Sequence, residues 1–548
     1  MLSCQSRKGG KENFHRLVII ALVALGFFSS CEERRENPNR HITLESLSGW
    51  RKTFLHVDAS HIGRLVYQYH QKESLNRLSD KYTLGLYKED DRLFWSDFRG
   101  ISCQADSLVA VLRQADSHGL SARIYRLEEI EADIRRMRSL DFDESDNTME
   151  KVVVRLDYRL TLAYLRYASG MRFGFVNPIQ TFNRLDPLKY DTLRNRVISY
   201  RGLFDIGVER PDRQFYVEAL SMVARDGVAE FLHEAEPDNA LYALLKRHLA
   251  VTDRMDKEEQ RRIVCNLERC RWRGAVPPID TAGCLVVVNL PAFHLYAYGA
   301  DSLLDMKVGC GTVKNKTPLL VSAIKRMEVN PLWNIPYNIL RDEVAHHAGD
   351  SAYFARNRYF IIDKNTGRQL LPSQVSASML RSGDYRVSQE GGEGNSLGRI
   401  VFRFDNNFSV FLHDTSSRSF FQRDNRGVSH GCVRVEKPFD LALFLWRQDD
   451  EWERDKLRIS MGMEPLTEKG EKYVEKEMER RGMKHDVKQM QAPMRLINVQ
   501  KIEPPVKLYI TYFTLYPADG DHLENYPDIY GYDDVIQQEI KPFIRHDI

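Results

Sequence analysis

The hydrophobic periodicity of this chain changes at about residue 283. Before that point apolar residues recur at helical spacing, and in residues 105–119 they line one face of a predicted helix that ends at Gly119, a typical C-terminal cap. After that point apolar runs are short and bounded by Pro, Gly and Asn, and residues 284–311 predict two or three strands joined by turns. Separate blocks with these two periods predict an α+β multidomain protein.

The predicted domains follow from this change of period. At 548 residues the chain is too long for a single hydrophobic core. We predict a mainly helical domain over residues 51–270, followed by a β-rich domain over residues 283–465. Inside the second domain, residues 340–390 are polar, Gly-rich and irregular, which predicts a long loop that is functional or mobile. Residues 466–548 predict a charged helix and a closing strand.

The N-terminus is predicted to be a signal peptide over residues 1–31. A basic segment precedes an apolar run over residues 17–30, which is too short for a membrane span of ~20 residues but suits a signal-peptide core. Two small residues before Cys31 resemble a lipoprotein processing box, although Phe28 stands where Leu is usual. We therefore expect export, lipidation of Cys31, a polar tether over residues 32–50 and a periplasmic, membrane-anchored protein. A plain signal peptide or an uncleaved anchor is the alternative.

Charge and cysteine content exclude several classes of protein. The chain has 79 Lys and Arg against 77 Asp and Glu, without a long basic run interleaved with aromatics, so nucleic-acid binding is not expected. Eight cysteines are too few for a disulfide scaffold at this length. Cys265 and Cys270 lack the CxxC spacing of a zinc ribbon or a redox pair.

Residues 410–435, VFLHDTSSRSFFQRDNRGVSHGCVRV, contain the candidate reactive groups. In an extended segment His430, Cys432 and Arg434 would share one face, while the alternating valines anchor the other face to a core. His413 closes the preceding predicted strand and can meet Cys432 if the two strands are neighbours.

Three interpretations of these groups remain open at this point. A histidine within hydrogen-bond reach would take the proton of a cysteine that is otherwise only roughly 3% thiolate at pH 7, and the backbone N–H groups of Gly431 and Cys432 could face a developing oxyanion. The histidine could be oriented by the Asp414 carboxylate or by a backbone carbonyl. The alternatives are a structural thiol and a zinc site of His413, His430 and Cys432, which lacks a fourth ligand.

These residues resemble the L,D-transpeptidases with a YkuD-type catalytic domain. In that family a histidine precedes [Ser/Thr]-His-Gly-Cys by about fifteen residues, and here fifteen residues separate His413 from Ser429. The blocks NLERCRW, VGCGTVKNKTPLL and VNPLWNIP are similar to the large Gram-negative subgroup, and the helical region is similar to its scaffold domain. Some members insert a three-helix peptidoglycan-binding domain before NLERCRW, which has no obvious counterpart here.

The resemblance implies a role for each residue of the motif. Cys432 is the nucleophile, and His413 is the general base, held by a backbone carbonyl near Asp414. The loop over residues 340–390 caps the substrate. The other implied site residues are Ser429, His430 and Gly431 around the oxyanion, Arg434 at substrate carboxylates, and Trp333 and Tyr337 in the cleft. Trp333 and Tyr337 could alternatively be buried core aromatics.

The resemblance also implies a function. We expect a peptidoglycan L,D-transpeptidase that forms 3→3 cross-links through a thioester, releases terminal D-alanine, and reacts with carbapenems. Stem peptides would be its partners, and no metal or organic cofactor is implied. The alternatives are an L,D-carboxypeptidase or amidase, in which water replaces the acceptor amine, and a non-catalytic wall-binding lipoprotein. The intact pair of His413 and Cys432 disfavours the last alternative.

Overall fold

The computed structural model describes residues 59–545 with seven short gaps. The gaps are residues 90–91, 98–99, 192–193, 279–283, 301, 483–493 and 520–521. The predicted signal peptide, Cys31 and the tether over residues 32–50 lie outside the described residues. No helix in the described part is long and apolar enough to cross a membrane.

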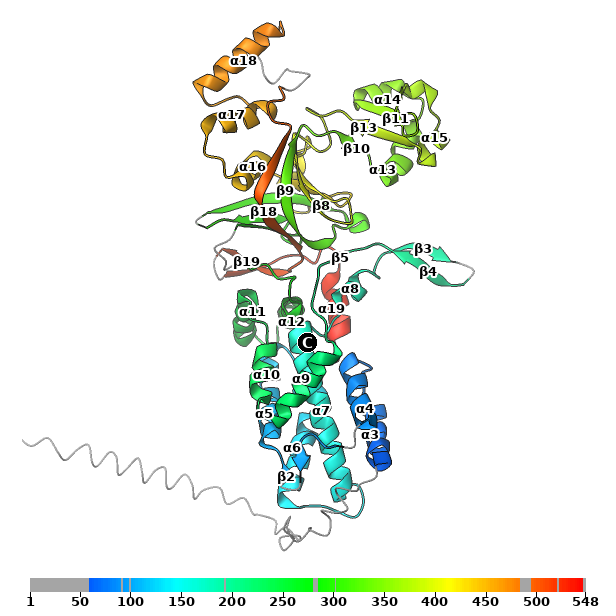
Figure 1. The fold of residues 1–548 in the computed structure, drawn as a ribbon, viewed down its shortest axis with the longest axis vertical. Coiled ribbons are helices and arrows are strands. Elements are labelled where there is room, and N and C mark those ends of the chain that lie inside the picture. Colours follow the sequence, from blue (N-terminus) through cyan, green and yellow to red (C-terminus); the bar gives the residue numbers. More distant parts are fainter. Residues whose placement is uncertain are drawn as a thin grey trace, which may run out of the picture. The chain divides into compact units, whose positions relative to one another are not determined.

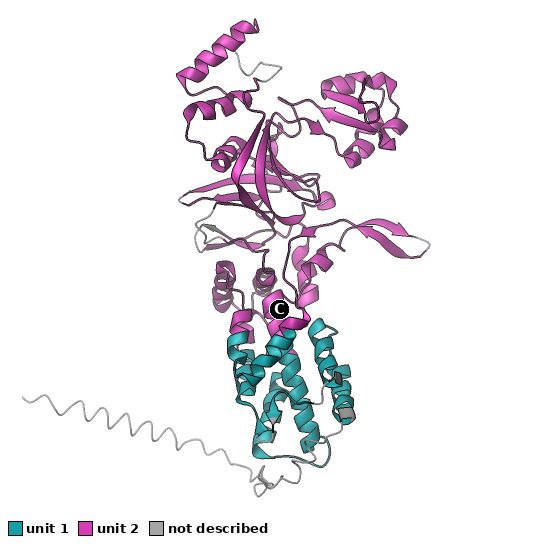
Figure 2. Ribbon diagram, viewed as in Figure 1, with its two compact units in different colours: residues 1–113, 125–166, 216–231 teal, residues 114–124, 167–215, 232–548 magenta. Residues whose placement is uncertain are grey.

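The chain divides into two compact units (Figure 2). Unit 1 contains the described part of Met1–Arg113 with Tyr125–Arg166 and Tyr216–Phe231, and unit 2 contains Gln114–Ile124, Tyr167–Phe215 and Leu232–Ile548. The predicted boundary near residue 270 does not coincide with this division, because several helices that precede it belong to unit 2.

Unit 1 is mainly helical, as the periodicity predicts. Its elements are α3 (Ala59–Glu73), α4 (Leu78–Glu89), β1 (Ser96–Asp97), β2 (Gly100–Ile101), α5 (Cys103–Leu112), α6 (Leu127–Ser139) and most of α7 (Met149–Phe173) and α9 (Arg213–Ala224). Buried polar contacts hold α7 in place. Arg166 donates to Asp80 at 2.7 Å, and the Asp157 carboxylate accepts the backbone N–H groups of Phe94 and Trp95. A buried carboxylate needs such donors to remain ionised.

Unit 2 is built around a ten-stranded sheet (Figure 1). The strand order is β14-β15-β17-β8-β7-β6-β18-β9-β5, with β16 beside β8, and the path closes on itself because β14 also pairs with β9. The strands are β5 (Phe204–Asp205), β6 (Leu285–Asn289), β7 (His294–Tyr298), β8 (Leu303–Gly311), β9 (Leu319–Val329), β14 (Ile400–Phe404), β15 (Leu412–His413), β16 (Gly427–Ser429), β17 (Val433–Val435) and β18 (Val499–Thr511). The three strands β6 to β8 confirm the predicted strands after residue 283, and the predicted closing strand is β18, between β6 and β9.

Helices and two further hairpins complete unit 2. They are η1 (Ala115–His118), α8 (Pro178–Phe182), β3 (Pro187–Asp191), β4 (Arg196–Tyr200), part of α10 (Val228–Ala235), α11 (Ala240–Val251), α12 (Lys257–Arg271), α16 (Pro438–Trp446), α17 (Glu451–Ser460), α18 (Glu468–Arg480), β19 (Leu515–Asp519), β20 (His522–Asn525) and α19 (Tyr532–Ile540). α11 begins at Ala240, where the side chain of Asn239 caps it by accepting the Tyr242 N–H. Helices before residue 271 and strands after residue 285 confirm the predicted α+β fold class.

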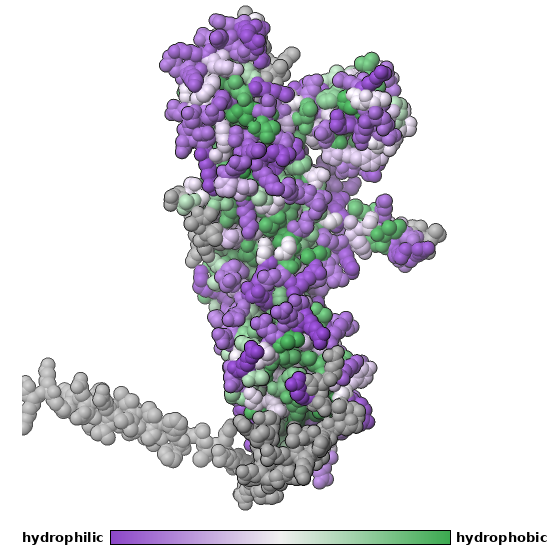
Figure 3. Space-filling view, viewed as in Figure 1, coloured by the Kyte–Doolittle hydropathy of each residue, from purple (hydrophilic) through white to green (hydrophobic). Residues whose placement is uncertain are grey.

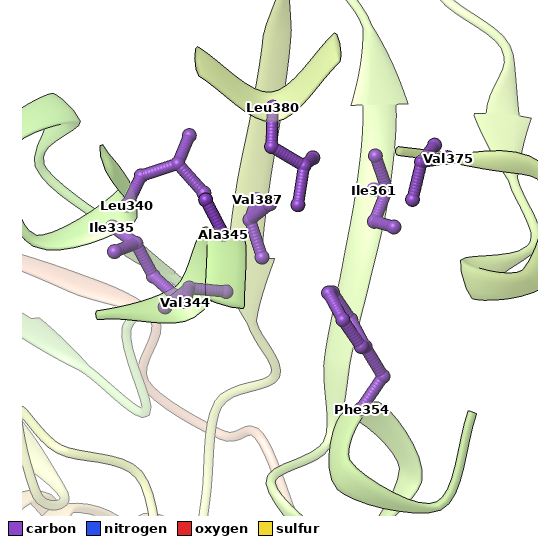
Figure 4. Close-up of a cluster of buried hydrophobic side chains, with 9 residues drawn as sticks. All are labelled: Ile335, Leu340, Val344, Ala345, Phe354, Ile361, Val375, Leu380 and Val387. Carbon is purple, nitrogen blue, oxygen red and sulfur yellow. The ribbon is translucent and has the colours of Figure 1, made fainter. Parts of the chain in front are cut away.

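The segment predicted as an irregular loop over residues 340–390 is a folded insertion. Its strands pair in the order β10 (Trp333–Asn334), β13 (Tyr385–Gln389), β11 (Tyr359–Asp363), β12 (Gln369–Leu370), with α13 (Tyr337–Asp342), α14 (Ser351–Arg356) and α15 (Ala377–Ser382). Nine buried apolar side chains, among them Leu340, Phe354 and Val387, form its core (Figure 4). The loop prediction is wrong because β11 and β13, the only five-residue strands of this small sheet, are separated by more than twenty residues, so no local pattern marks their pairing.

Candidate active site

Neighbouring strands bring the two predicted catalytic residues together. β15 pairs in parallel with β17, His413 lies opposite Arg434, and the Val433 N–H donates to the Phe411 carbonyl at 2.9 Å. Cys432 directly precedes β17. His413 and Arg434 share a face of the paired strands, and in an extended segment Cys432, two residues before Arg434, would share it, with its Cα roughly 8 Å from that of His413 on standard strand spacings. An imidazole and a thiol can together span that distance.

A turn at Gly431 separates His430 from the other polar residues of the motif. Gly431 has a φ of 120°, a conformation that residues with a Cβ rarely adopt. The predicted shared face is therefore wrong for His430, which is exposed, whereas Cys432 and Arg434 are half-buried. Nε2 of His430 pairs with the carboxylate of Glu343 at 3.0 Å, and Glu343 belongs to the folded insertion.

Hydrogen bonds hold the turn on both sides. The Ser429 hydroxyl donates to the Cys432 carbonyl at 2.6 Å and accepts the Gly431 N–H at 3.0 Å. The buried Thr317 hydroxyl donates to the Gly431 carbonyl at 2.9 Å and accepts the Gly311 N–H at 2.8 Å. The Gly431 N–H is thus already occupied, so of the two predicted oxyanion donors only the Cys432 N–H remains. Ser429 acts here as a brace of the turn.

The backbone of Asp414 orients His413. Nδ1 of His413 lies 2.5 Å from the Asp414 carbonyl oxygen, which can only accept, so Nδ1 carries the proton and Nε2 is left as the basic nitrogen. The Asp414 carboxylate instead accepts the Arg399 N–H at 2.8 Å and the Arg418 guanidinium at 2.9 Å. Of the two orienting groups that the sequence leaves open, the geometry selects the backbone carbonyl.

Burial keeps the side chains of His413 and Cys432 uncharged at neutral pH. It lowers the pKa of His413 to about 4, and the cations of Arg434 and Arg403 act in the same direction. Burial also raises the pKa of the Cys432 thiol above its ordinary value. The thiol donates weakly to the Ser409 carbonyl at 3.8 Å. The resting pair is therefore a thiol and a neutral imidazole, and not the ionised cysteine that the motif alone suggests.

Arg434 has an unused donor beside Cys432. Its guanidinium lies 5.7 Å from the centre of the Phe420 ring, and its buried Nε has no hydrogen-bond partner among the described residues. The nearby Arg403 guanidinium donates a hydrogen bond to the Glu328 carboxylate at 2.9 Å. Arg434 is thus the cation of this region whose geometry fits the carboxylate-binding role that the resemblance implies.

Trp333 and Tyr337 belong to the folded insertion. Trp333 packs against its core, with the ring centre 6.5 Å from that of Tyr359. Tyr337 is 49% exposed, and its hydroxyl donates to the Arg381 carbonyl at 2.6 Å. The core-aromatic alternative therefore describes Trp333 and not Tyr337. Within the described residues, neither ring has a hydrogen bond or ring contact with Cys432.

The geometry disfavours the zinc interpretation. His413 lies on the strand beside the one that follows Cys432, but His430 turns away to Glu343. Over the described ranges, no group of three or more His, Cys, Asp or Glu side chains is arranged to hold a metal ion.

The sequence did not point to Thr317, Tyr530 or Glu343. The Tyr530 hydroxyl donates to the Gly311 carbonyl at 2.7 Å and accepts the Thr317 N–H at 3.2 Å. Tyr530 therefore holds Thr317, and Thr317 holds the turn. Thr317 lies 114 residues from Gly431 in the chain, and Tyr530 lies 219 residues from Gly311. No local signal marks partners so distant in sequence.

Replacing Thr317 by valine is expected to loosen the turn. Valine keeps the shape but leaves the Gly311 N–H and the Gly431 carbonyl without partners, at about 1–3 kcal/mol for each buried unsatisfied group. We expect a lower free energy of unfolding in urea and slower alkylation of Cys432. Thr317→Ser keeps the hydroxyl and is the matched control. If Thr317→Val were as stable as Thr317→Ser, the Thr317 hydroxyl would not stabilise the turn.

Acid is expected to destabilise the protein through His413. Its pKa is about 4 in the fold and about 6.5 when unfolded, so below pH 6.5 only the unfolded chain takes up this proton. The stability contribution is complete above about pH 6.5 and is lost as the pH falls toward 4, by about 2 kcal/mol at pH 5. His413→Gln does not titrate, so it should lose that much less between pH 7 and pH 5 in urea unfolding. Equal acid losses would show that the imidazole is not buried and neutral.

Comparisons with known proteins agree with this geometry. Residues 83–249 match the scaffold domain, and residues 285–484 match the L,D-transpeptidase catalytic domain of the YkuD family. A Haemophilus influenzae protein named "Putative L,D-transpeptidase" is 29% identical over 330 residues, which are 59% of this chain and 59% of that relative. His413 and Cys432 both lie in the matched catalytic domain. The chain therefore joins a scaffold domain to an L,D-transpeptidase catalytic domain of the YkuD family.

Proposed function

We propose that this protein is a peptidoglycan L,D-transpeptidase that forms 3→3 cross-links through a thioester on Cys432. One observation supports the proposal above all others. His413 is fixed by the Asp414 carbonyl so that its basic nitrogen is free, on a strand parallel to the strand that follows Cys432. A positioned base beside a half-buried thiol is the arrangement that cysteine acyl transfer needs.

In the first half-reaction Cys432 attacks the donor stem peptide. Because the resting pair is uncharged, His413 takes the thiol proton as the sulfur–carbon bond forms, which is general-base catalysis at the moment of attack. The Sγ bonds to the carbonyl carbon of the third stem residue, and the bond from that carbon to the nitrogen of D-alanine breaks. His413 returns the proton to the departing amine. A thioester and free D-alanine result.

The developing oxyanion is assigned to the Cys432 N–H. The Gly431 N–H is held by Ser429, so the turn presents the next amide along the chain to the reacting carbonyl. Removing a single oxyanion donor costs about 3 kcal/mol of transition-state stabilisation in other enzymes, so one fixed amide is a substantial contribution. The unused Nε of Arg434 would pair with a carboxylate of the anionic donor stem.

In the second half-reaction an acceptor attacks the thioester. The side-chain amine of a neighbouring stem peptide attacks the thioester carbonyl carbon and forms the 3→3 amide as the carbon–sulfur bond breaks. His413 accepts the amine proton and passes it to the departing sulfur, which restores the Cys432 thiol. Water in place of the amine would make the protein an L,D-carboxypeptidase or amidase. We favour the amine because the family match is to an L,D-transpeptidase catalytic domain.

Purified protein incubated with defined tetrapeptide muropeptides tests the proposal. Mass spectrometry of the products should detect 3→3 dimers together with released D-alanine. Tripeptide products without dimers would replace the proposal with a carboxypeptidase. Unchanged substrate, with retained binding to peptidoglycan, would replace it with a non-catalytic wall-binding protein.

We also propose that the chain is exported and lipidated at Cys31, which would hold it at a membrane in the periplasm. The basic and apolar segments before Cys31 support this proposal. Cys31→Ser should move the protein from the membrane fraction to the soluble fraction, and an unchanged membrane fraction would rule out this anchor.

A further inference from the structure

The hairpin of β3 and β4 presents apolar side chains to solvent. The two strands form a sheet of their own, and Figure 1 shows them as an arm beside β5. Leu188, Tyr190, Ile198 and Tyr200 are 56%, 53%, 60% and 38% exposed. Apolar and polar residues lie next to each other on this arm in Figure 3. Single exposed apolar residues are ordinary, but four within one isolated hairpin indicate a contact surface.

The same hairpin is basic, although the whole chain has a formal charge of only +2. Residues 184–201 contain five Lys and Arg and two Asp. Both acidic side chains are engaged, since Asp186 pairs with Lys316 at 2.6 Å and Asp191 pairs with Arg196 at 3.9 Å. The outward surface therefore combines aromatic rings with excess positive charge, which favours an anionic partner.

The base of the hairpin is fixed to the segment that supports the active-site turn. The Asp186–Lys316 pair is largely buried, and the Arg201 N–H donates to the Asp186 carbonyl at 2.8 Å. Lys316 immediately precedes Thr317, whose hydroxyl holds the Gly431 carbonyl. The Lys316 carbonyl oxygen would lie 3.7 Å from a Cβ placed on Gly431. The base of the hairpin is thus joined to the segment that supports the turn before Cys432.

We propose that the β3–β4 hairpin binds the anionic peptidoglycan polymer and presents it to Cys432, an inference that rests on the proposed function. Tyrosine rings stack on the apolar faces of sugar rings, and arginines form paired hydrogen bonds with stem-peptide carboxylates. The polymer offers both groups in repeats, so a small extended arm can bind several at once. An anionic lipid surface shares the charge but would not need an arm fixed to the active-site turn, so the polymer is favoured.

Co-sedimentation with purified peptidoglycan sacculi tests the proposal. The hairpin variant Tyr190→Ser/Arg194→Ser/Tyr200→Ser removes two rings and one charge at exposed positions. The control variant Val251→Ser/Met255→Ser removes two apolar side chains that are 81% and 79% exposed on another part of unit 2. We expect the hairpin variant to bind sacculi about tenfold more weakly, or about 1.4 kcal/mol, and the control to bind like the parent. Both sets are compared in a Cys432→Ala background, which excludes covalent capture.

Three results would overturn the inference. The first is that the parent and the hairpin variant bind sacculi equally. The second is that the hairpin variant loses binding only to vesicles that contain phosphatidylglycerol. The third is that it loses only self-association, measured by sedimentation. A second measurement separates this inference from the proposed function. With Cys432 present, the hairpin variant should lose more of its rate on sacculi than on soluble muropeptides, because only the polymer can occupy the hairpin and the active site at once. A parent protein that converts no soluble muropeptide would refute the proposed function, while the binding comparison would still stand.

Discussion

Cys432→Ala is expected to abolish formation of 3→3 dimers from tetrapeptide muropeptides while leaving the protein folded. The change removes the sulfur that would form the thioester, and this sulfur has only weak hydrogen bonds, with the Ser409 carbonyl and the Phe411 backbone. Dimer yield is measured by mass spectrometry, and folding is measured by urea unfolding. Cys103→Ala is the matched control, because Cys103 is also a free cysteine but lies in unit 1. Unchanged dimer yield in Cys432→Ala would remove Cys432 from the mechanism.

Three buried cysteines of unit 2 are poor candidates for the same chemistry. Burial raises the pKa of Cys310 to about 12, and this thiol interacts with the Tyr530 hydroxyl at 3.6 Å. Burial also raises the pKa of Cys265 and Cys270 in α12, and both side chains are inaccessible to a polymer substrate. A buried thiol in apolar surroundings is inert.

His413→Ala is expected to slow acylation of Cys432 by ~10²-fold or more, the usual size of a general-base effect. Because the thiol and the imidazole are both neutral at rest, the thiol must give up its proton during the attack. Without the imidazole, no described group takes the place of Nε2 as the acceptor of that proton. Single-turnover acylation by a carbapenem, followed by intact mass, measures the rate. His413→Gln fills the buried space with a side chain that is not basic, and it should be equally slow. Acylation at the parent rate in either variant would exclude His413 as the base.

The sequence predicted the elements whose partners are local. Between their turn residues, the strands over residues 285–311 either alternate apolar and polar residues or are apolar throughout. They form three antiparallel strands in sequence order, where the sequence predicted two or three. The pair β14 and β15 also forms between segments that are close in sequence, joined by a connection that contains Asn406. The motif itself fixed Cys432 and His413 as candidates, because residue types and spacing are local information.

The sequence could not predict features that depend on distant contacts or on one backbone torsion. The positive φ at Gly431 turns His430 away from Cys432, and nothing in the alternation of residues 430–434 indicates that turn. β5 joins the catalytic sheet through β9, more than one hundred residues later in the chain. The helix predicted up to Gly119 ends at Leu112 and is followed by the separate short helix η1, which ends at Gly119 with a φ of 73°.

The mass of the protein during turnover tests the thioester on Cys432 most directly. The protein is mixed with a donor tetrapeptide muropeptide in the absence of an acceptor, quenched in acid within one turnover, and analysed by intact mass and peptide mapping. The expected result is an adduct equal in mass to the donor without its terminal D-alanine, attached to the peptide that contains Cys432. Product formation with Cys432 unmodified throughout, or an adduct on another residue, would contradict it.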